Sequence, residues 1–212
     1  MKLNSIIKYL TIADFALLSG FSLIAPIFAV YILDNIKGGN LEIVGIATAI
    51  NILSKAVFQL PIARYLDKKR GDLDEYYFTI IGSAFLAVSP LFYLIISTPT
   101  ELYAVQAFYG ISLAMNYPGW MSLFTRHAEK ERESSQWAIY SSITGIGSAA
   151  AAALGGFIGE RYGFNLVFWL VFFITVLGTV SLVKIYPPLK LRHEHYKMKE
   201  AEAFEIKKAE MK

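Results

Sequence analysis

The chain has 212 residues, of which 55% are hydrophobic, 15% aromatic and 17% charged, and its net charge is +3. It has no cysteine, which excludes disulfides, thiolate metal sites and cysteine nucleophiles. The basic residues lie in loops and in the tail rather than along one stripe, so the charge does not favour a nucleic-acid partner.

Six apolar stretches follow one another, each long enough for a helix to cross the roughly 30 Å core of a bilayer, which needs about 20 residues. The predicted spans are residues 10–33, 41–66, 77–97, 102–125, 136–159 and 166–185. The first stretch is too long for a signal-peptide core and lacks a small-x-small cleavage site, so we expect it to remain as span one. The sequence predicts an all-α membrane protein with one six-helix transmembrane domain, residues 1–188, and a charged, helical tail, residues 189–212.

Basic residues are concentrated in alternate loops. Of the 20 lysines and arginines, 17 lie on one side: before span one, from the end of span two to span three, between spans four and five, or from the end of span six onward. The opposite loops hold only Lys37 and Arg161, and Lys55 lies inside span two. Because cytoplasmic flanks retain Lys and Arg, we expect a multi-pass protein of the plasma (inner) membrane with both termini in the cytoplasm.

The two halves of the chain share a weak pattern. GFSL at residues 20–23, followed by Pro26, is echoed by GISL at residues 110–113, followed by Pro118. Since each half has three spans, an odd number, the second copy would enter the membrane from the opposite side. This predicts a 3+3 inverted repeat of the kind found in many secondary transporters. Ordinary packing of small residues between helices is the alternative explanation.

These features resemble one six-span half of a major facilitator superfamily (MFS) transporter, and the N-terminal half in particular. Family members carry the motif G-x-x-x-D-R-x-G-R-R between spans two and three, where residues 63–71 here read ARYLDKKRG. Asp67 and its basic neighbours match, whereas Lys68 replaces Arg, Ala63 replaces Gly, and Gly71 is displaced. The resemblance implies that Asp67 and Lys68 latch one conformation of the transporter. The alternative is that the basic residues only determine topology.

Prolines in spans one and four predict breaks in helix geometry. Proline removes a backbone hydrogen bond and clashes with the preceding turn, so Pro26 in span one and Pro118 in span four predict helix kinks. In the family these two spans line the substrate cavity, and kinks there suit a rocking mechanism. Kinks that only assist packing are the equal alternative.

Polar residues inside the spans are the candidates for function, because a charge near the bilayer centre costs roughly 2.5–3.5 kcal/mol. Lys55 has Asn51 one turn before it and Gln59 one turn after it, so the three share a helix face. We expect this face to form a cavity wall in which Lys55 binds an anionic group or pairs with a carboxylate. The alternative is a lysine that snorkels to the interface.

Asp14 is an acidic residue about one turn inside span one. It could carry protons, pair with Lys55, or be favoured only by the dipole at the start of its helix. Weaker candidates for cavity lining are Gln106, Tyr109 and Asn116 in span four, with Ser141 and Thr144 in span five.

No catalytic constellation is recognisable. The three histidines lie outside the spans, and the motifs G-x-S-x-G and H-E-x-x-H are absent. We therefore expect no enzymatic activity, no metal site and no cofactor.

The resemblance implies secondary-active transport of a small solute by alternating access, with proton coupling as an option. Family members ordinarily use two six-span halves, and this chain supplies one. We therefore expect a homodimer or a second six-span partner in the bilayer. A truncated remnant, or an accessory or scaffold subunit that transports nothing, is the alternative.

Overall fold

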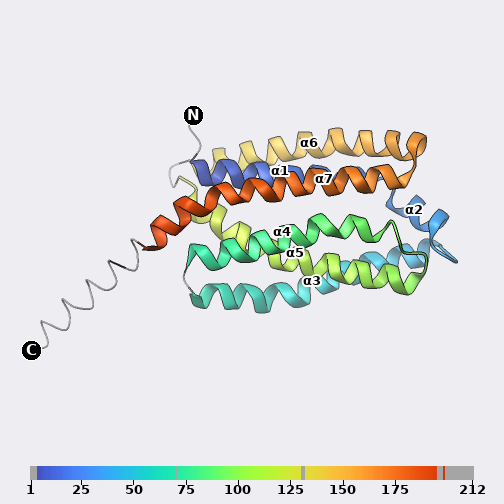
Figure 1. Cartoon of the computed structure of the whole chain (residues 1–212), viewed down its shortest axis with the longest axis horizontal. Helices are drawn as coiled ribbons and strands as arrows, with labels where there is room; N and C mark the ends of the chain where they lie inside the picture. The colour runs from blue at the N-terminus through green and yellow to red at the C-terminus, as the bar shows by residue number, and fades with distance from the viewer. Residues whose placement is uncertain (1–3, 70, 130–131, 195–197, 199–212) are drawn as a thin grey trace, which may run out of the picture.

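The computed structural model describes residues 4–69, 71–129, 132–194 and 198. In this part of the chain the structure is all helical, and the helices form an elongated bundle (Figure 1). The elements are α1 (Ser5–Ile24), α2 (Phe28–Asn35), α3 (Leu41–Lys69), α4 (Asp72–Phe92), α5 (Pro99–His127), α6 (Glu133–Tyr162), α7 (Phe164–Leu182) and the 3-10 turn η1 (Val183–Ile185).

Five helical segments of the described residues are long and apolar enough to span a membrane: Ser5–Ile24, Leu41–Lys68, Asp72–Phe92, Glu133–Tyr162 and Phe164–Glu194. The remaining predicted span, residues 102–125, lies within α5, which is as long as α3. It packs against both α3 and α4, and its polar residues Gln106 and Asn116 are buried. The chain is thus an all-α membrane bundle in which neighbouring helices cover the polar residues of α5.

Span one consists of two helices. α1 ends at Ile24 and α2 begins at Phe28, with Pro26 in the turn between them. This agrees with the missing hydrogen-bond donor of proline. Pro118, in contrast, lies inside α5, which continues as one helix from Pro99 to His127.

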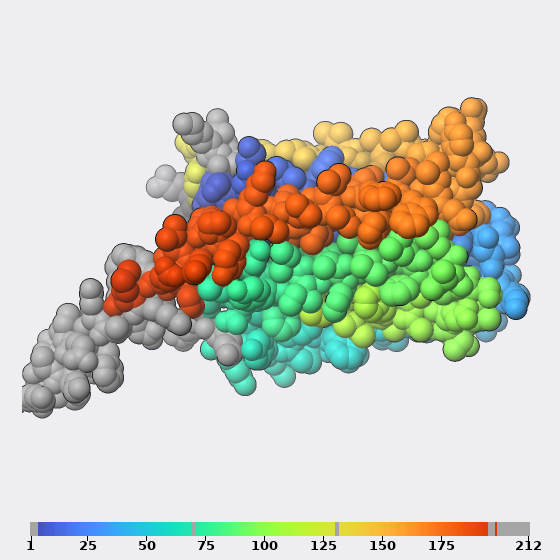
Figure 2. Space-filling view, in the orientation of Figure 1, coloured from blue at the N-terminus to red at the C-terminus, as the bar shows by residue number. Residues whose placement is uncertain are grey.

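The helix pairing has a two-fold pattern. α1 packs against α6 and α7, α5 packs against α3 and α4, and α4 packs against α7. Figure 2 shows α4 and α7 side by side along one face. Spans one to three correspond to spans four to six if α1 is matched with α5, α3 with α6 and α4 with α7. Under this exchange the pair α1–α6 becomes α5–α3, the pair α1–α7 becomes α5–α4, and the pair α4–α7 is unchanged. The bundle therefore has the predicted 3+3 repeat.

Glycines occupy equivalent positions in two of these interfaces. A Cβ added to Gly82 of α4 would lie 2.5 Å from the backbone N of Asn116 on α5. A Cβ added to Gly178 of α7 would lie 2.7 Å from the Cβ of Ala16 on α1. Both glycines let two helix backbones approach closely. In a bilayer the hydrophobic effect does not drive helices together, so the van der Waals contacts made possible by this close approach stabilise the interface.

The opposing helices return these contacts at the same spacing. Gly119 of α5 faces Thr79 and Glu75 of α4, which lie three and seven positions before Gly82. Gly20 of α1 faces Thr175 and Val171 of α7, which lie three and seven positions before Gly178. The contacts align Gly20 with Gly119. They do not align it with Gly110, as the sequence echo had suggested, because Gly110 faces α3 instead.

The loops separate into two ends. The N-terminus, the α3–α4 and α5–α6 connections and the chain after α7 all lie at one end, and α2 lies at the other (Figure 1). We call the first the basic end, because it carries Arg64, Lys68, Arg126, Arg132, Lys184, Lys190 and Arg192. Two buried apolar clusters, one around Phe168 and one around Phe124, flank the residues 14–21 of α1 that line the cavity described below.

Candidate functional site: two chambers and a charged end

A chamber of about 200 Å³ lies between the helices, and both predicted intramembrane charges line it. Asp14 comes from α1 and Lys55 from α3, and α5 and α6 supply the other polar groups. We call it the charged chamber; its polar lining is Asp14, Lys55, Tyr109, Asn116, Tyr117 and Tyr140.

The two charges do not pair with each other. The Lys55 ammonium lies 4.8 Å from the ring centroid of Tyr117, a cation–π contact. Within the described part of the chain no carboxylate forms an ion pair with Lys55. Asp14 instead accepts a short hydrogen bond from the hydroxyl of Tyr140 on α6. The structure thus brings Asp14 and Lys55 into one chamber but gives each its own aromatic partner.

A second chamber, of about 230 Å³, lies toward the α2 end. Asn51 and Gln106 line it, and their amides are already used: Asn51 donates to the carbonyl of Gln106 at 3.3 Å, and Gln106 donates to the Tyr93 hydroxyl at 3.0 Å. The rest of the lining is mainly hydrocarbon and aromatic, so we call it the apolar chamber; it comprises Phe21, Ile24, Ala25, Phe28, Thr48 and Tyr109.

The other two predicted wall residues lie toward the basic end. Asn116 is buried and donates from its amide to the Thr79 carbonyl at 3.2 Å and to the Ser83 hydroxyl at 2.8 Å. It therefore ties α5 to α4 as well as lining the charged chamber. Gln59 lines a separate, open hollow that it shares with Pro118.

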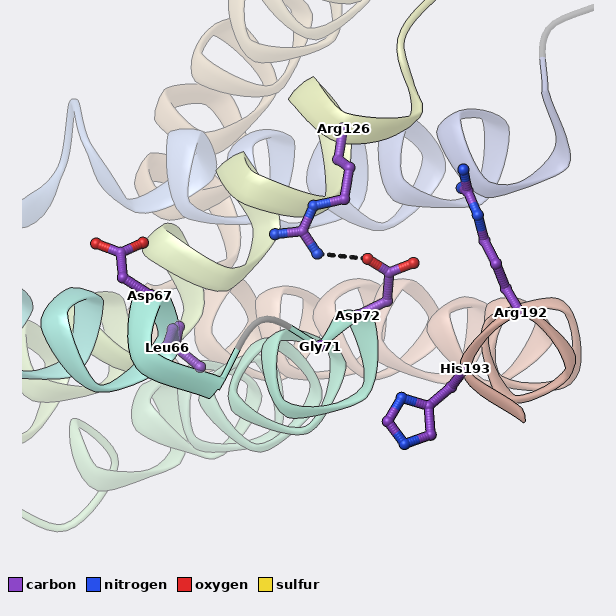
Figure 3. A pocket seen from close by; sticks show the side chains of 7 residues that line it. All are labelled: Leu66, Asp67, Gly71, Asp72, Arg126, Arg192 and His193. Atoms are coloured by element: carbon purple, nitrogen blue, oxygen red, sulfur yellow. Dashed lines mark hydrogen bonds and ion pairs between the residues drawn. The ribbon is translucent and has the colours of Figure 1, made fainter. Parts of the chain in front are cut away.

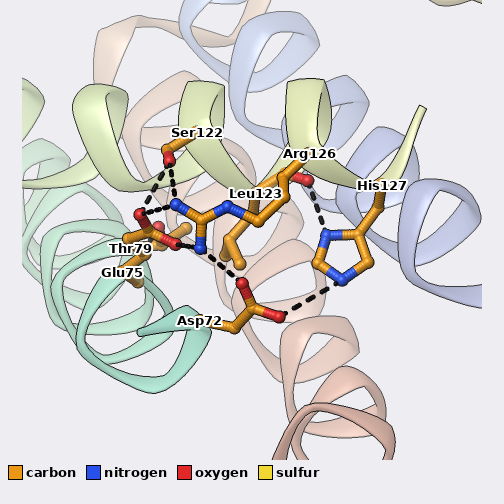
Figure 4. Close-up of polar contacts among 7 residues, drawn as sticks. All are labelled: Asp72, Glu75, Thr79, Ser122, Leu123, Arg126 and His127. Carbon is orange, nitrogen blue, oxygen red and sulfur yellow. Dashed lines mark hydrogen bonds and ion pairs between the residues drawn. The ribbon is translucent and has the colours of Figure 1, made fainter. Parts of the chain in front are cut away.

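Charged side chains of α4 and α5 meet at the basic end (Figure 4). Arg126 binds both oxygens of Glu75, at 2.7 and 2.9 Å, and also bridges to Asp72. His127 is fully buried, with Nδ1 2.9 Å from the Leu123 carbonyl and Nε2 3.5 Å from Asp72. Helix α4 thus supplies the acids of this cluster and α5 the bases.

The predicted latch residues lie beside this cluster rather than within it. Asp67 lines a hollow of about 400 Å³ together with Asp72, Arg126, Arg192 and His193, and the ion pair in Figure 3 joins Arg126 to Asp72. Asp67 and Lys68 are exposed and make no ion pair within the described residues. The side chain of Lys69 and all of Arg70 fall outside those residues.

The family model of the Major Facilitator Superfamily matches residues 10–210. The chain belongs to this superfamily. It is 28% identical over 179 residues to an uncharacterised MFS-type transporter of Methanocaldococcus jannaschii, covering 84% of this chain and 45% of the relative. It is 27% identical over 177 residues to a proton-coupled antiporter flippase of Staphylococcus saprophyticus, covering 80% and 44%.

The chain thus spans just under half the length of these two transporters. An uncharacterised MFS-type transporter of Bacillus subtilis, 25% identical over 163 residues, is covered over 96% of its own length and 77% of this chain. Membership of the superfamily makes the chain a multi-pass membrane protein of a transporter family.

The superfamily motif can now be compared with the charged cluster. If Ala63 and Asp67 occupy the first Gly and the Asp of the motif, Asp72 falls on its last position, which is basic in the family pattern. Here an acid stands at that position and pairs with Arg126 of α5. The residues that match the MFS motif best are therefore not the ones that form ion pairs.

Sequence reasoning missed the aromatic partners. Tyr140 is 126 residues from Asp14, and no local pattern joins them. Phe21 and Tyr117 were not singled out in spans one and four, whereas Tyr109 was a candidate for cavity lining and lines both chambers. Tyr109 precedes Asn116 by seven residues and Tyr117 by eight, which is two helical turns. This spacing could have placed the three residues on one face of α5.

Proposed function

We propose that the chain is one six-helix unit of a secondary transporter that moves a small solute by alternating access and couples this movement to protons. The observation that carries the proposal is that Asp14 and Lys55, from two different helices, line one chamber. Charges within membrane spans are rare, and those that face a cavity mark solute or ion pathways.

The two charges take different roles. Lys55 binds an anionic group of the solute, because within the described residues its ammonium lies over the Tyr117 ring and pairs with no carboxylate. Asp14 carries the proton, and the Tyr140 hydroxyl orients its carboxylate. Proton coupling is favoured by the staphylococcal relative, which is named a proton-coupled antiporter flippase. Asn116 lines the same chamber, Asn51 and Gln106 line the apolar chamber, and Gln59 lines the open hollow nearer the basic end.

We further propose that the working unit contains two such bundles, either two copies of this chain or one copy and a second six-span protein. The chain is half the length of two transporter relatives. In the apolar 18-residue stretch of α3 only 6% of the residues are buried, and in that of α6 only 11%, whereas 50% are buried in that of α4. Because α3 carries Lys55, lipid contact along this helix would leave a charge uncompensated.

Alternating access needs contacts that break and form at the two ends of the bundle. We propose that the basic end faces the cytoplasm at the plasma membrane and that its charges latch one conformation. Asp67 lines the same hollow as Asp72 and Arg126, and Lys68 follows Asp67 in α3, so both pairs are within the region that would move.

The test is solute-driven proton movement in proteoliposomes that contain the full chain and an internal pH-sensitive dye. Gradients of organic acids, amino acids and sugars are imposed in turn, and the pH change is compared between wild type, Lys55→Met and Asp14→Asn. Lys37→Met, in a loop at the α2 end, is the matched control. We expect at least one solute to drive a pH change that both cavity variants lose and the control keeps.

Folded wild-type protein that moves none of these solutes, alone or mixed with a six-span partner, would support the accessory-subunit alternative instead. Solute movement that is unchanged in Lys55→Met would contradict the cavity assignment while leaving transport itself intact.

A further inference from the structure

The charged and apolar chambers share a wall. Phe21 of α1 and Tyr109 of α5 line both chambers. Their rings stack with centroids 4.7 Å apart and an interplanar angle of 26°. These two stacked side chains therefore form a boundary that both chambers share.

The Lys55 ammonium has donors to spare in the charged chamber. Asp14 balances its charge formally, but the Asp14 carboxylate accepts a hydrogen bond from Tyr140 and forms no ion pair with Lys55 within the described residues. The Lys55 ammonium has three donors and lies over the face of the Tyr117 ring. A bound anion would give these donors acceptors, whereas a bound cation would share the chamber with the Lys55 ammonium, which repels it.

The apolar chamber has the opposite character. Ile24, Ala25 and Phe28 present hydrocarbon, and Phe21 and Tyr93 present rings. Its two amides each donate one hydrogen bond within the protein, Gln106 to the Tyr93 hydroxyl and Asn51 to the backbone of α5. The chamber is therefore suited to a flat apolar group rather than to a sugar or another polyhydroxylated body.

We infer that the solute is an anionic amphiphile, with one anionic group at Lys55 and a flat apolar body that passes the Phe21–Tyr109 pair into the apolar chamber. This rests on the proposed transport function and names its substrate class. The stacked rings provide flat faces for such a body, and Phe21 and Tyr109 are the specificity-determining residues because both line the two chambers.

The test is equilibrium binding of labelled probes to the purified full chain in lipid nanodiscs, with protein-free nanodiscs as the blank. The probes are 1-naphthoate, its neutral analogue 1-naphthamide, acetate, and the cation 1-naphthylmethylammonium. We expect naphthoate to bind at least about tenfold more tightly than each of the others, because only it satisfies both chambers.

Two variants separate the contributions of the chambers. Lys55→Met, with Lys55→Gln as a second variant, should remove the preference for naphthoate over naphthamide. Ala25→Phe, which fills the apolar chamber, should weaken naphthoate binding about tenfold and leave the preference for naphthoate over naphthamide in place. Lys37→Met should change neither. Retained helicity and a single elution peak establish that each variant is folded.

Equal binding of naphthoate and naphthamide, tighter binding of the cation, or acetate binding as tight as naphthoate would each overturn the inference, as would no binding of any probe. Transport of a solute outside this class, without naphthoate binding, would overturn the substrate class and leave the transport function standing. The expected selectivity in a protein that moves no solute would support the ligand class and contradict transport.

Discussion

Arg126 of α5 holds Glu75 of α4 through two parallel hydrogen bonds, with Nη2 2.7 Å from Oε1 and Nη1 2.9 Å from Oε2. The side chain of Glu75 is only 3% exposed, whereas that of Arg126 is 41% exposed. The same guanidinium bridges to Asp72. One partly exposed base therefore compensates two acids, one of which is buried, and the α4–α5 interface at the basic end depends on it.

Replacing Arg126 with Met should lower stability, because Glu75 would be left buried without its partner. Breaking a fully buried pair costs about 3–5 kcal/mol, and solvent screening at the exposed guanidinium reduces our expectation to about 1–3 kcal/mol. Thermal unfolding in detergent measures the loss.

The matched control is Lys190→Met, which breaks the exposed pair with Glu194 and should cost about 0–1 kcal/mol. Adding Glu75→Gln to Arg126→Met should recover part of the loss, since the uncompensated charge is removed. Equal losses in Arg126→Met and Lys190→Met would show that the bidentate pair contributes nothing beyond a surface contact.

The glycines of the repeat interfaces give a second prediction. Gly82→Ala and Gly178→Ala should each destabilise the bundle by about 1–3 kcal/mol, because their added Cβ atoms would lie 2.5 Å from Asn116 and 2.7 Å from Ala16. Gly145→Ala and Gly156→Ala are the controls, since an added Cβ there meets nothing within 4 Å. In these controls the higher helix propensity of alanine should instead stabilise the protein by about 0.5–1 kcal/mol.

The architecture could be predicted from the sequence because its cause is local. A run of about 20 apolar residues must be helical in a bilayer, and short loops leave few ways to connect neighbours. Even Pro26 acted locally, through its missing N–H, to end α1. The 3+3 pattern was visible as well, although the short echo aligned Gly20 with Gly110 rather than with Gly119.

The candidate site could be predicted only in part, because its contacts join distant segments. Asp14 and Lys55 could be identified because placing a charged side chain inside a bilayer costs free energy. Which group each one meets depends on helix rotation and on α6, and the residue that bonds Asp14 is Tyr140 rather than Lys55. At the basic end, the motif directed attention to Asp67, whereas the ion pair depends on Asp72 lying opposite Arg126.

The orientation of the bundle gives a third prediction, which follows from the 17 of 20 basic residues in loops of one side. Because the chain has no cysteine, single cysteines can be introduced cleanly. Cysteines at Lys37 and Asn165 should react with an impermeant thiol reagent added to intact cells, and cysteines at Lys68 and Glu133 should react only after lysis. The reverse pattern would invert the proposed topology.

The final prediction separates the two possible partners of Asp14 by double-mutant cycles. Asp14 bonds Tyr140 and is not paired with Lys55, so the coupling free energy should lie with the tyrosine. Asp14→Asn and Tyr140→Phe should be coupled by about 1.5–3 kcal/mol in thermal unfolding, the value of one hydrogen bond to a charged group. The destabilising effects of Asp14→Asn and Lys55→Met should add to within about 0.5 kcal/mol.

Lys55→Met on its own should insert as well as wild type, since the cost of placing a charge in the bilayer is removed. Strong coupling between Asp14 and Lys55, with none between Asp14 and Tyr140, would mean that the two charges pair directly and that the Lys55 ammonium is not free to receive an anion.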